Sequence, residues 1–257
     1  MKKSIFLGCI LIAALSFTSC ENSKNGGDLT INVKVENGAD YNKLVDEVSA
    51  INYIYTEVYD PYWDYWYYTR QDFYIATGTY KNGGFKLTLP KQIDNRLFNN
   101  FDYDIDIPSG VSVSNTNVKT ATVDRFKAYK NTEYVDDLFY GYINYTVTNY
   151  YEVFVSYIYV DADVKITGSY KYNGPYYDED YTETEEYDAN LKKGWNTVYM
   201  IYDVTAKKEV QTFTTKKPKA DLKWYFEEET VFYAPEKAKQ KDNKPNERGF
   251  RSFKLFQ

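Results

Sequence analysis

The residues of this sequence best suited to chemistry are aromatic rings placed beside carboxylates. Eleven aromatic residues fall within Tyr53–Tyr74, and several of them flank Asp60 and Asp64. Alternation along a strand cannot bury so many rings on one face, so some of them should be exposed. Exposed tryptophan and tyrosine rings rimmed by carboxylates offer flat surfaces to sugars or peptides. The candidate ligand-binding residues are therefore Tyr62, Trp63, Tyr65 and Trp66.

The same segment has a second interpretation, in which its rings are structural. It could bend over the open end of the fold and pack its rings as a hydrophobic lid, with the tyrosine hydroxyls pointing outward. Aromatic residues are the main apolar material of this chain, because 30 of its 257 residues are tyrosine and 15 are phenylalanine. Both interpretations stay open at the level of the sequence.

Two sets of alternating aspartates are candidate calcium ligands. Asp102, Asp104 and Asp106 would share one face of an extended segment, and Asp161 with Asp163 forms a smaller pair. Neither set matches the twelve-residue EF-hand loop, and a solvated strand face is the favoured explanation of both sets, with metal binding as the minor alternative. We therefore expect no metal site and no cofactor.

A third acidic segment, Asp178–Asp188, holds seven carboxylates and no cation. Like charges at this density resist compaction, which favours a mobile acidic loop. Two carboxylates across a cleft could hydrolyse a glycoside, but nothing in the sequence singles out a pair among 37 acidic residues.

The composition removes most familiar catalytic mechanisms. The chain has no histidine, and its only cysteines are Cys9 and Cys20. These counts exclude Ser-His-Asp and Cys-His catalysis and the usual zinc ligand sets. No glycine-rich phosphate loop or dinucleotide fingerprint follows a predicted strand. We therefore predict a protein that is not an enzyme.

The N-terminus has the pattern of a secretory leader. Two lysines precede the apolar run Ile5–Phe17, which is too short to span a bilayer as a helix. The residues Leu15–Cys20 resemble a bacterial lipobox, in which the cysteine becomes the lipidated first residue of the mature chain. That resemblance implies a membrane anchor at Cys20. The alternative is an ordinary leader in which this cysteine is fortuitous.

Alternating apolar and polar residues after the leader predict an all-β chain. Segments rich in Val, Ile, Thr, Tyr and Phe recur between glycine-rich or polar turns, which is typical of one or two antiparallel β-sandwich units, Ig-like or transthyretin-like. The predicted divisions are a lipoprotein signal peptide (1–19), a flexible tether (20–27), an N-terminal β-sandwich unit (28–108), a C-terminal β-sandwich unit (111–233) and a disordered basic tail (234–257).

The strand pattern is specific enough to locate individual elements. Asn82-Gly83, between two alternating segments, predicts a type I′ hairpin turn, and 91–100 is a candidate short helix. The predicted strands are 29–35, 48–58, 72–80, 85–89, 119–129, 138–148, 150–160, 163–172, 195–203, 209–215 and 223–233.

The charge balance bears on the partners. The formal net charge is −6 at pH 7, and removal of Lys2 and Lys3 with the leader would leave 29 positive against 37 negative residues. A surface of that sign does not attract phosphate backbones, so we expect no nucleic-acid partner.

The leader, the tyrosine-rich strands and the segments Tyr80–Pro90 and Lys193–Asn196 together resemble uncharacterised lipoproteins of Bacteroidetes. The resemblance implies a β-sandwich lipoprotein of the outer membrane, at the cell surface or on the periplasmic face. It also implies a binding module for a glycan or protein ligand. The alternative is a structural or adhesive envelope subunit similar to fimbrillin-type proteins, with Leu29–Val35 as its candidate donor strand.

Overall fold

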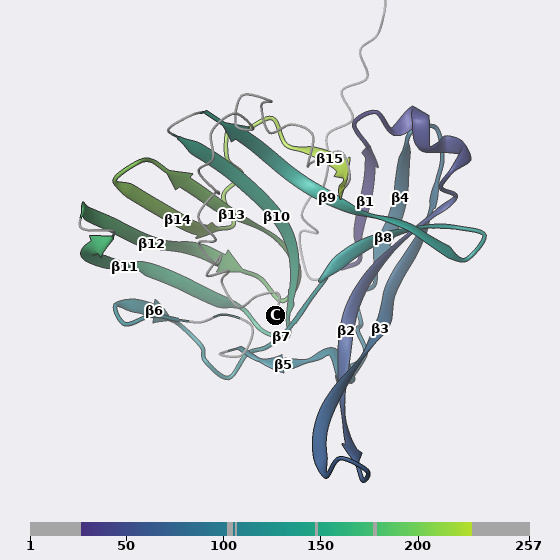
Figure 1. The fold of residues 1–257 in the computed structure, drawn as a ribbon, viewed down its shortest axis with the longest axis horizontal. Helices are drawn as coiled ribbons and strands as arrows, with labels where there is room; N and C mark the ends of the chain where they lie inside the picture. The colour runs from purple at the N-terminus through teal and green to yellow at the C-terminus, as the bar shows by residue number, and fades with distance from the viewer. Residues whose placement is uncertain (1–26, 102–104, 106, 147–148, 177–178, 228–257) are drawn as a thin grey trace, which may run out of the picture.

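The computed structural model describes residues 27–101, 105, 107–146, 149–176 and 179–227, which form an all-β, sandwich-like fold (Figure 1). This confirms the predicted fold class. The signal peptide, Cys20 and the basic tail lie outside these ranges. The elements are β1 (Leu29–Lys34), η1 (Gly38–Lys43), β2 (Glu47–Asp60), β3 (Tyr65–Tyr80), β4 (Gly84–Leu89), η2 (Asn95–Leu97), β5 (Asn99–Asn100), β6 (Val111–Val113), β7 (Lys119–Thr122), β8 (Arg125–Lys130), β9 (Glu133–Tyr145), β10 (Tyr150–Val160), β11 (Val164–Tyr176), β12 (Glu179–Leu191), β13 (Gly194–Val204), β14 (Lys208–Thr214) and β15 (Lys223–Phe226).

Within the described ranges, all strands belong to one 15-stranded sheet. The main path runs β1-β4-β3-β2-β8-β9-β10-β13-β14-β12-β11-β6, while β15 pairs with β9 and β7 pairs with β5 and β10. Strand ladders in this sheet are antiparallel except for β12 and β14, which pair in parallel. Because β2 pairs with β8, the sheet continues across the expected boundary between 108 and 111.

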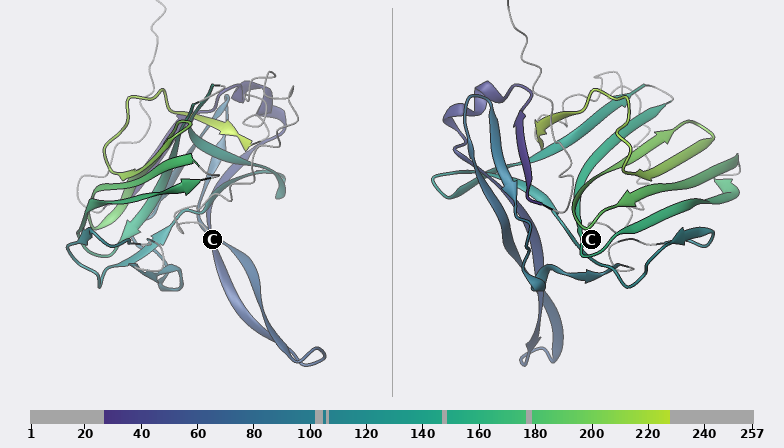
Figure 2. Two further views of the ribbon diagram at one scale, coloured as in Figure 1. Left: turned by 60° about the vertical axis from the view of Figure 1, so that its left-hand side comes forward. Right: turned by 180° about the vertical axis from the view of Figure 1, so that it is seen from behind.

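The sheet folds back on itself where β9 changes its neighbour. The first half of β9 pairs with β8 over Glu133–Leu138, and the second half pairs with β10 over Gly141–Tyr145. β13 pairs with β10 over the whole of Tyr150–Val160, whereas β9 pairs with it only over Tyr150–Phe154 and β7 only over Ile158–Val160. The strands therefore form two layers, β1-β4-β3-β2-β8 and β10-β13-β14-β12-β11, with β9 crossing between them (Figures 1 and 2).

Gly141 lies at the point of exchange. A Cβ atom on this residue would lie 2.1 Å from the carbonyl oxygen of Val153 on β10 and 2.4 Å from the ring of Phe139. Both distances are far below van der Waals contact, so glycine is required for β9 to approach β10 here.

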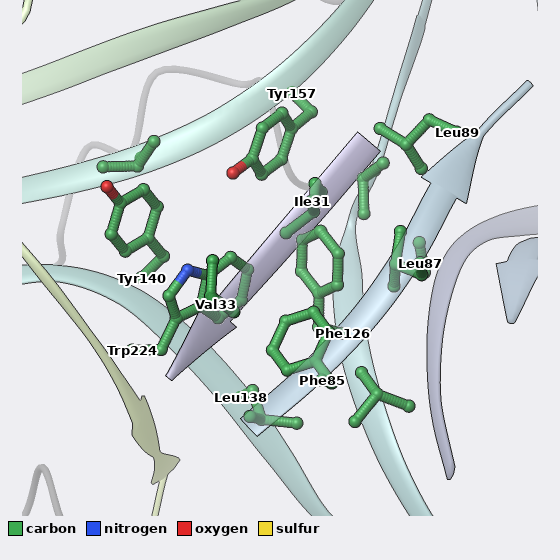
Figure 3. Close-up of a cluster of buried hydrophobic side chains, with 14 of the residues drawn as sticks. Ile31, Val33, Phe85, Leu87, Leu89, Phe126, Leu138, Tyr140, Tyr157 and Trp224 are labelled. Carbon is green, nitrogen blue, oxygen red and sulfur yellow. The ribbon is translucent and has the colours of Figure 1, made fainter. Parts of the chain in front are cut away.

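The first hydrophobic core fills the angle between the two layers. Buried residues of β1 and β4, such as Ile31 and Leu89, face Tyr140 of β9 and Tyr157 of β10 (Figure 3). Trp224 of β15 closes this cluster. Its ring stacks on Tyr140 with a centroid distance of 4.9 Å. The same ring meets the rings of Phe85 and Phe126 edge-on, each at 4.9 Å. One side chain thereby joins four strands that are distant in sequence.

A second core lies on the opposite face of β10. Alternate residues of that strand divide between the two clusters, so that Val153 faces the first and Ile158 faces the second. The second cluster includes Phe213 of β14 and Phe101 and Ile105 of the segment before β6. Both cores therefore draw residues from each side of the expected boundary.

The hairpin turn between β3 and β4 has the predicted chemistry. Asn82 and Gly83 have φ of 54° and 72°, as a type I′ turn requires at both central positions. The turn is closed by a hydrogen bond of 2.8 Å from the backbone N–H of Lys81 to the carbonyl of Gly84. This local prediction is confirmed.

Two local predictions are wrong. The acidic segment expected as a mobile loop forms most of β12, which pairs with β11 on one edge and β14 on the other; Tyr181 and Tyr187 are buried on one face, and the acids Glu186 and Asp188 are exposed on the other. The candidate helix at 91–100 is only the single turn Asn95–Leu97, which the Asp94 side chain caps at the N–H of Arg96 before the chain extends again.

The packing of Trp224 gives a direct test of the first core. Trp224→Ala should lower the free energy of unfolding by about 3–5 kcal/mol, because it empties the centre of a four-strand cluster. Trp66→Ala, at an exposed ring, is the matched control and should change it by less than about 0.5 kcal/mol. Urea unfolding followed by circular dichroism measures both, and equal effects would contradict the proposed core.

Candidate functional site

The first candidate site is a two-stranded arm formed by the distal parts of β2 and β3. We call residues 55–72 the aromatic arm, and it projects away from the two layers (Figure 2). None of its residues is buried. The predicted ligand-binding residues lie at its tip, with Tyr62 82% exposed, Trp63 68%, Tyr65 50% and Trp66 62%.

The tip is ordered by short-range polar contacts. The Asp60 carboxylate accepts hydrogen bonds from the backbone N–H groups of Tyr62 and Trp63, at 2.9 and 3.2 Å. Asp64 has a φ of 52°, and its carboxylate accepts a hydrogen bond of 2.5 Å from the hydroxyl of Tyr59. Aspartate is well suited to both positions, because its short side chain can bond to nearby backbone and tolerates a left-handed conformation.

The pairing register places rings on both faces of the arm, with Tyr65 beside Tyr67 on one face and Trp66 on the other. Tyr59 is opposite Trp66, and their ring centroids are 5.0 Å apart. Two residues further from the tip, Glu57 is opposite Tyr68. Cross-strand partners share a face of a hairpin, so this face carries flat apolar rings beside a carboxylate. Such a surface can stack on the C–H faces of a sugar or hold a peptide.

The lid interpretation of this segment is wrong. A lid would bury its rings against the open end of the fold, whereas these rings are exposed on a projecting hairpin. The physical reason is that β2 and β3 extend beyond the strands beside them. β8 pairs with β2 only over Glu47–Ile51, and β4 pairs with β3 only at Thr79 and Tyr80.

The second candidate site is a cavity of about 710 Å³ beside the exchange of partners in β9. Its walls come mainly from β2, β8, β9 and β10, with single residues from β3, η2, β5, β7 and β13, and Tyr53 and Tyr55 at the base of the arm are part of the lining. The Arg70 guanidinium, which also lines the cavity, lies over the Tyr53 ring at 4.3 Å from its centre. The cavity therefore opens where the arm joins the body of the fold.

Two of the acidic side chains along this cavity have partners within the wall. Asp124 accepts hydrogen bonds from the Thr122 hydroxyl at 2.5 Å and from the backbone N–H of Tyr53 at 3.1 Å. Asp137 pairs with Arg125, with 2.6 Å between its Oδ2 and the Nη1 atom. These contacts join β2 to β8 and β8 to β9, and thus give both acids a structural role.

Glu152 differs from these acids. It lies on β10, lines the cavity and is only 4% exposed. Among the described residues, none gives its carboxyl group a hydrogen bond or an ion pair. Burial disfavours the charged form, so it raises the pKa of Glu152 to about 8. At neutral pH this side chain is mostly a neutral acid in an apolar wall.

The sequence analysis missed Glu152, although a signal was present. It is the one charged residue in Tyr150–Val160, where residues on both faces are otherwise apolar or neutral. A single carboxylate in such a strand must form an ion pair, take up a proton or bind a ligand. The strand alone does not show which of these applies, because the answer depends on partners distant in sequence.

Of the aspartates considered as calcium ligands, Asp161 and Asp163 lie within the described residues. Asp102, Asp104 and Asp106 lie outside the described residues. The Asp161 side chain accepts a hydrogen bond from the backbone N–H of Lys119, and Asp163 pairs with Lys192 at 2.9 Å. Across the part of the chain that the structure describes, no three acidic, histidine or cysteine side chains gather to hold a metal ion.

The environment of Glu152 predicts a specific pH dependence. Between the pKa of an ordinary glutamate, 4.5, and about 8, the folded state keeps a proton that the unfolded chain releases. Glu152 therefore lowers stability as pH rises through this window, by at most about 1.4 kcal/mol per pH unit. Tyr202, opposite Glu152 on β13, stays neutral throughout, because burial first and the charge of Glu152 second raise its pKa to about 12.

The substitution Glu152→Gln removes the ionisable carboxyl group and keeps the size and shape of the protonated side chain. The variant and the wild type should have similar unfolding free energies at pH 5, and the variant should be the more stable at pH 8. Urea titrations of both proteins from pH 5 to 9 measure the difference. A difference that does not change with pH would show that Glu152 is ionised in the folded state.

Comparison with known proteins supplies no analogue for either site. No family model, curated protein or solved structure matches this chain. Over the described ranges, no helix has both the length and the apolar character needed to cross a membrane. The aromatic arm and the cavity are therefore the features of this chain that bear on its function.

Proposed function

We propose that this protein is a non-catalytic binding protein, anchored to the outer membrane by a lipid on Cys20, whose aromatic arm binds a glycan or a peptide. The observation that carries this proposal is the exposure of Tyr62, Trp63, Tyr65 and Trp66 at the tip of a projecting hairpin. Large apolar rings gathered at one exposed place are unfavourable in water unless a partner covers them.

The geometry of the arm suits an extended ligand. Rings recur at alternate positions on one face, so successive contacts are about 7 Å apart along the strand. Tyrosine and tryptophan contribute large contact areas with few rotatable bonds, which keeps the entropy loss on binding small. Carboxylates at Glu57, Asp60 and Asp64 provide hydrogen-bond acceptors around the rings for hydroxyl or amide groups.

The structure weakens the argument for a structural or adhesive subunit. That hypothesis takes Leu29–Val35 as a donor strand for a neighbouring copy. In this chain the segment pairs with β4 along Leu29–Lys34, and the side chains of Leu29, Ile31 and Val33 are buried in the first core. Donating it would empty the protein's own core, so the binding role is the better supported of the two.

Anchoring fits the position of the folded part in the sequence. The ordered strands begin at Leu29, only nine residues after Cys20. A connection of nine residues spans at most about 32 Å when fully extended. A lipid on Cys20 would therefore hold the fold within a short distance of the membrane.

The binding role predicts a loss of affinity when the arm loses its indole rings. The double variant Trp63→Ala/Trp66→Ala should bind the ligand at least about tenfold more weakly, a change of about 1.4 kcal/mol. Glycan and peptide arrays identify the ligand on the wild type, and calorimetry then compares the proteins. Tyr172→Ala, at an exposed ring on β11, is the control and should bind like the wild type. Empty arrays, or an unchanged double variant, would count against the arm.

The anchor predicts a modification that depends on one residue. Cells that express the wild type should incorporate radiolabelled palmitate into the protein, and cells that express Cys20→Ala should not. Protease treatment of intact and lysed cells then distinguishes the cell surface from the periplasmic face. Label retained in the variant would contradict lipid attachment at Cys20.

A further inference from the structure

The cavity beside β9 has a buried acid, Glu152, on its wall, and no residue in the described part of the chain gives this acid a hydrogen bond or an ion pair. Glu152 shares its face of β10 with Phe154 and Ser156, and all three line the cavity. The Phe154 ring contacts the ring of Phe139 edge-on, with 5.2 Å between centroids. Ile143 lies opposite Glu152 on β9, Tyr202 lies opposite it on β13, and Met200 also lines the cavity.

The surrounding contacts make Glu152 distinct from the other acids of this wall. Asp124 and Asp137 hold strands together through the hydrogen bonds described above. Glu152 has no such role, and a tightly packed interior would normally carry an apolar residue at this position. A carboxyl group kept in an apolar wall beside an open cavity has the arrangement expected of a ligand-binding group.

We infer that this cavity binds a small organic cation, with an ammonium group beside the Glu152 carboxylate and an apolar or aromatic part packed against Phe139 and Phe154. An ammonium group would give the Glu152 carboxylate both an opposite charge and hydrogen-bond donors. Aromatic rings next to the carboxylate add an attraction between the cation and their faces.

The cationic residues of the cavity do not compete for this position. Arg125 is held by Asp137 at 2.6 Å, and Arg96 is held by Asp94 at 2.7 Å. Arg70 lies over the Tyr53 ring at the base of the arm. The positive charges therefore lie on β3, η2 and β8, while Glu152 lies on β10 between Ile143 of β9 and Tyr202 of β13. This separation favours a cation at the Glu152 end.

The inference does not rest on the proposed function of the arm, because it concerns a different set of residues. Ionising Glu152 on binding must release its proton to the solvent, since the ligand arrives already protonated. At pH 7 this amounts to about one proton per ligand bound. A neutral ligand that accepts a hydrogen bond from the protonated acid would release none.

Calorimetric titration of the full-length protein with phenethylamine tests this assignment. Repeating the titration at pH 7 in two buffers with different ionisation enthalpies gives the number of protons released. We expect saturable binding with close to one proton released, and at least tenfold weaker binding of 2-phenylethanol, which has the same ring without the charge. We expect the same loss for phenethylamine on Glu152→Gln.

The variant Trp63→Ala/Trp66→Ala separates the cavity from the arm, and it should bind phenethylamine like the wild type. Three results would overturn the inference, namely no binding of the amine, equal binding of the alcohol, or binding without proton release. The proton count is obtained on the wild type, so it remains decisive even where Glu152→Gln alters folding.

Discussion

The change of partner in β9 is the constraint on which the rest of this structure depends. One continuous strand hydrogen bonds to β8 through its first half and to β10 through its second, and this joins two layers that would otherwise be separate sheets. The exchange needs a close approach of β9 and β10 at Gly141, where a side chain would collide with the Val153 carbonyl. The angle between the layers makes room for the first core, and the divergence of β8 and β10 leaves the cavity.

The first core is stabilised by aromatic rings, and several of their polar ends have partners, although among the described residues the buried indole N–H of Trp224 has none. The hydroxyl of Tyr80 donates to the carbonyl of Gly38 at 2.7 Å, and that of Tyr159 donates to the carbonyl of Lys91 at 3.1 Å. The indole N–H of Trp195 donates to the carbonyl of Pro90 at 2.9 Å. Each ring therefore contributes buried apolar area and also attaches a connecting segment to the sheet. This explains how a chain so rich in tyrosine builds a stable interior.

Local features of this fold could be predicted from the sequence, and long-range ones could not. The limits of β10 and the Asn82-Gly83 turn follow from short patterns whose energetics are set by adjacent residues. The exposed rings at the tip of the arm were predicted for a similar reason, because eleven aromatics in one segment exceed what one face can bury. A lid was also consistent with that composition, and the outcome depends on which strands end first. The acidic segment forms a strand instead of a loop because it pairs with β11 and β14.

The cavity and Glu152 belong to the long-range part. Glu152 acquires its environment from Ile143 on β9 and Tyr202 on β13, which are its neighbours only once the strands are in register. The parallel pairing of β12 with β14 is likewise invisible in any local pattern, since it joins residues brought together by the intervening β13. A sequence shows the residue types available for such sites, and the pairing decides which of them meet.

The separation of the aromatic arm from both cores has an evolutionary consequence. Residues 55–72 bury no side chain, so substitutions there leave the folding equilibrium almost unchanged. Gly141 and Trp224 have no such freedom, because each is held by contacts from several strands. Natural selection can therefore alter the surface of the arm over many generations while the scaffold stays the same, as happens with variable loops on a constant framework.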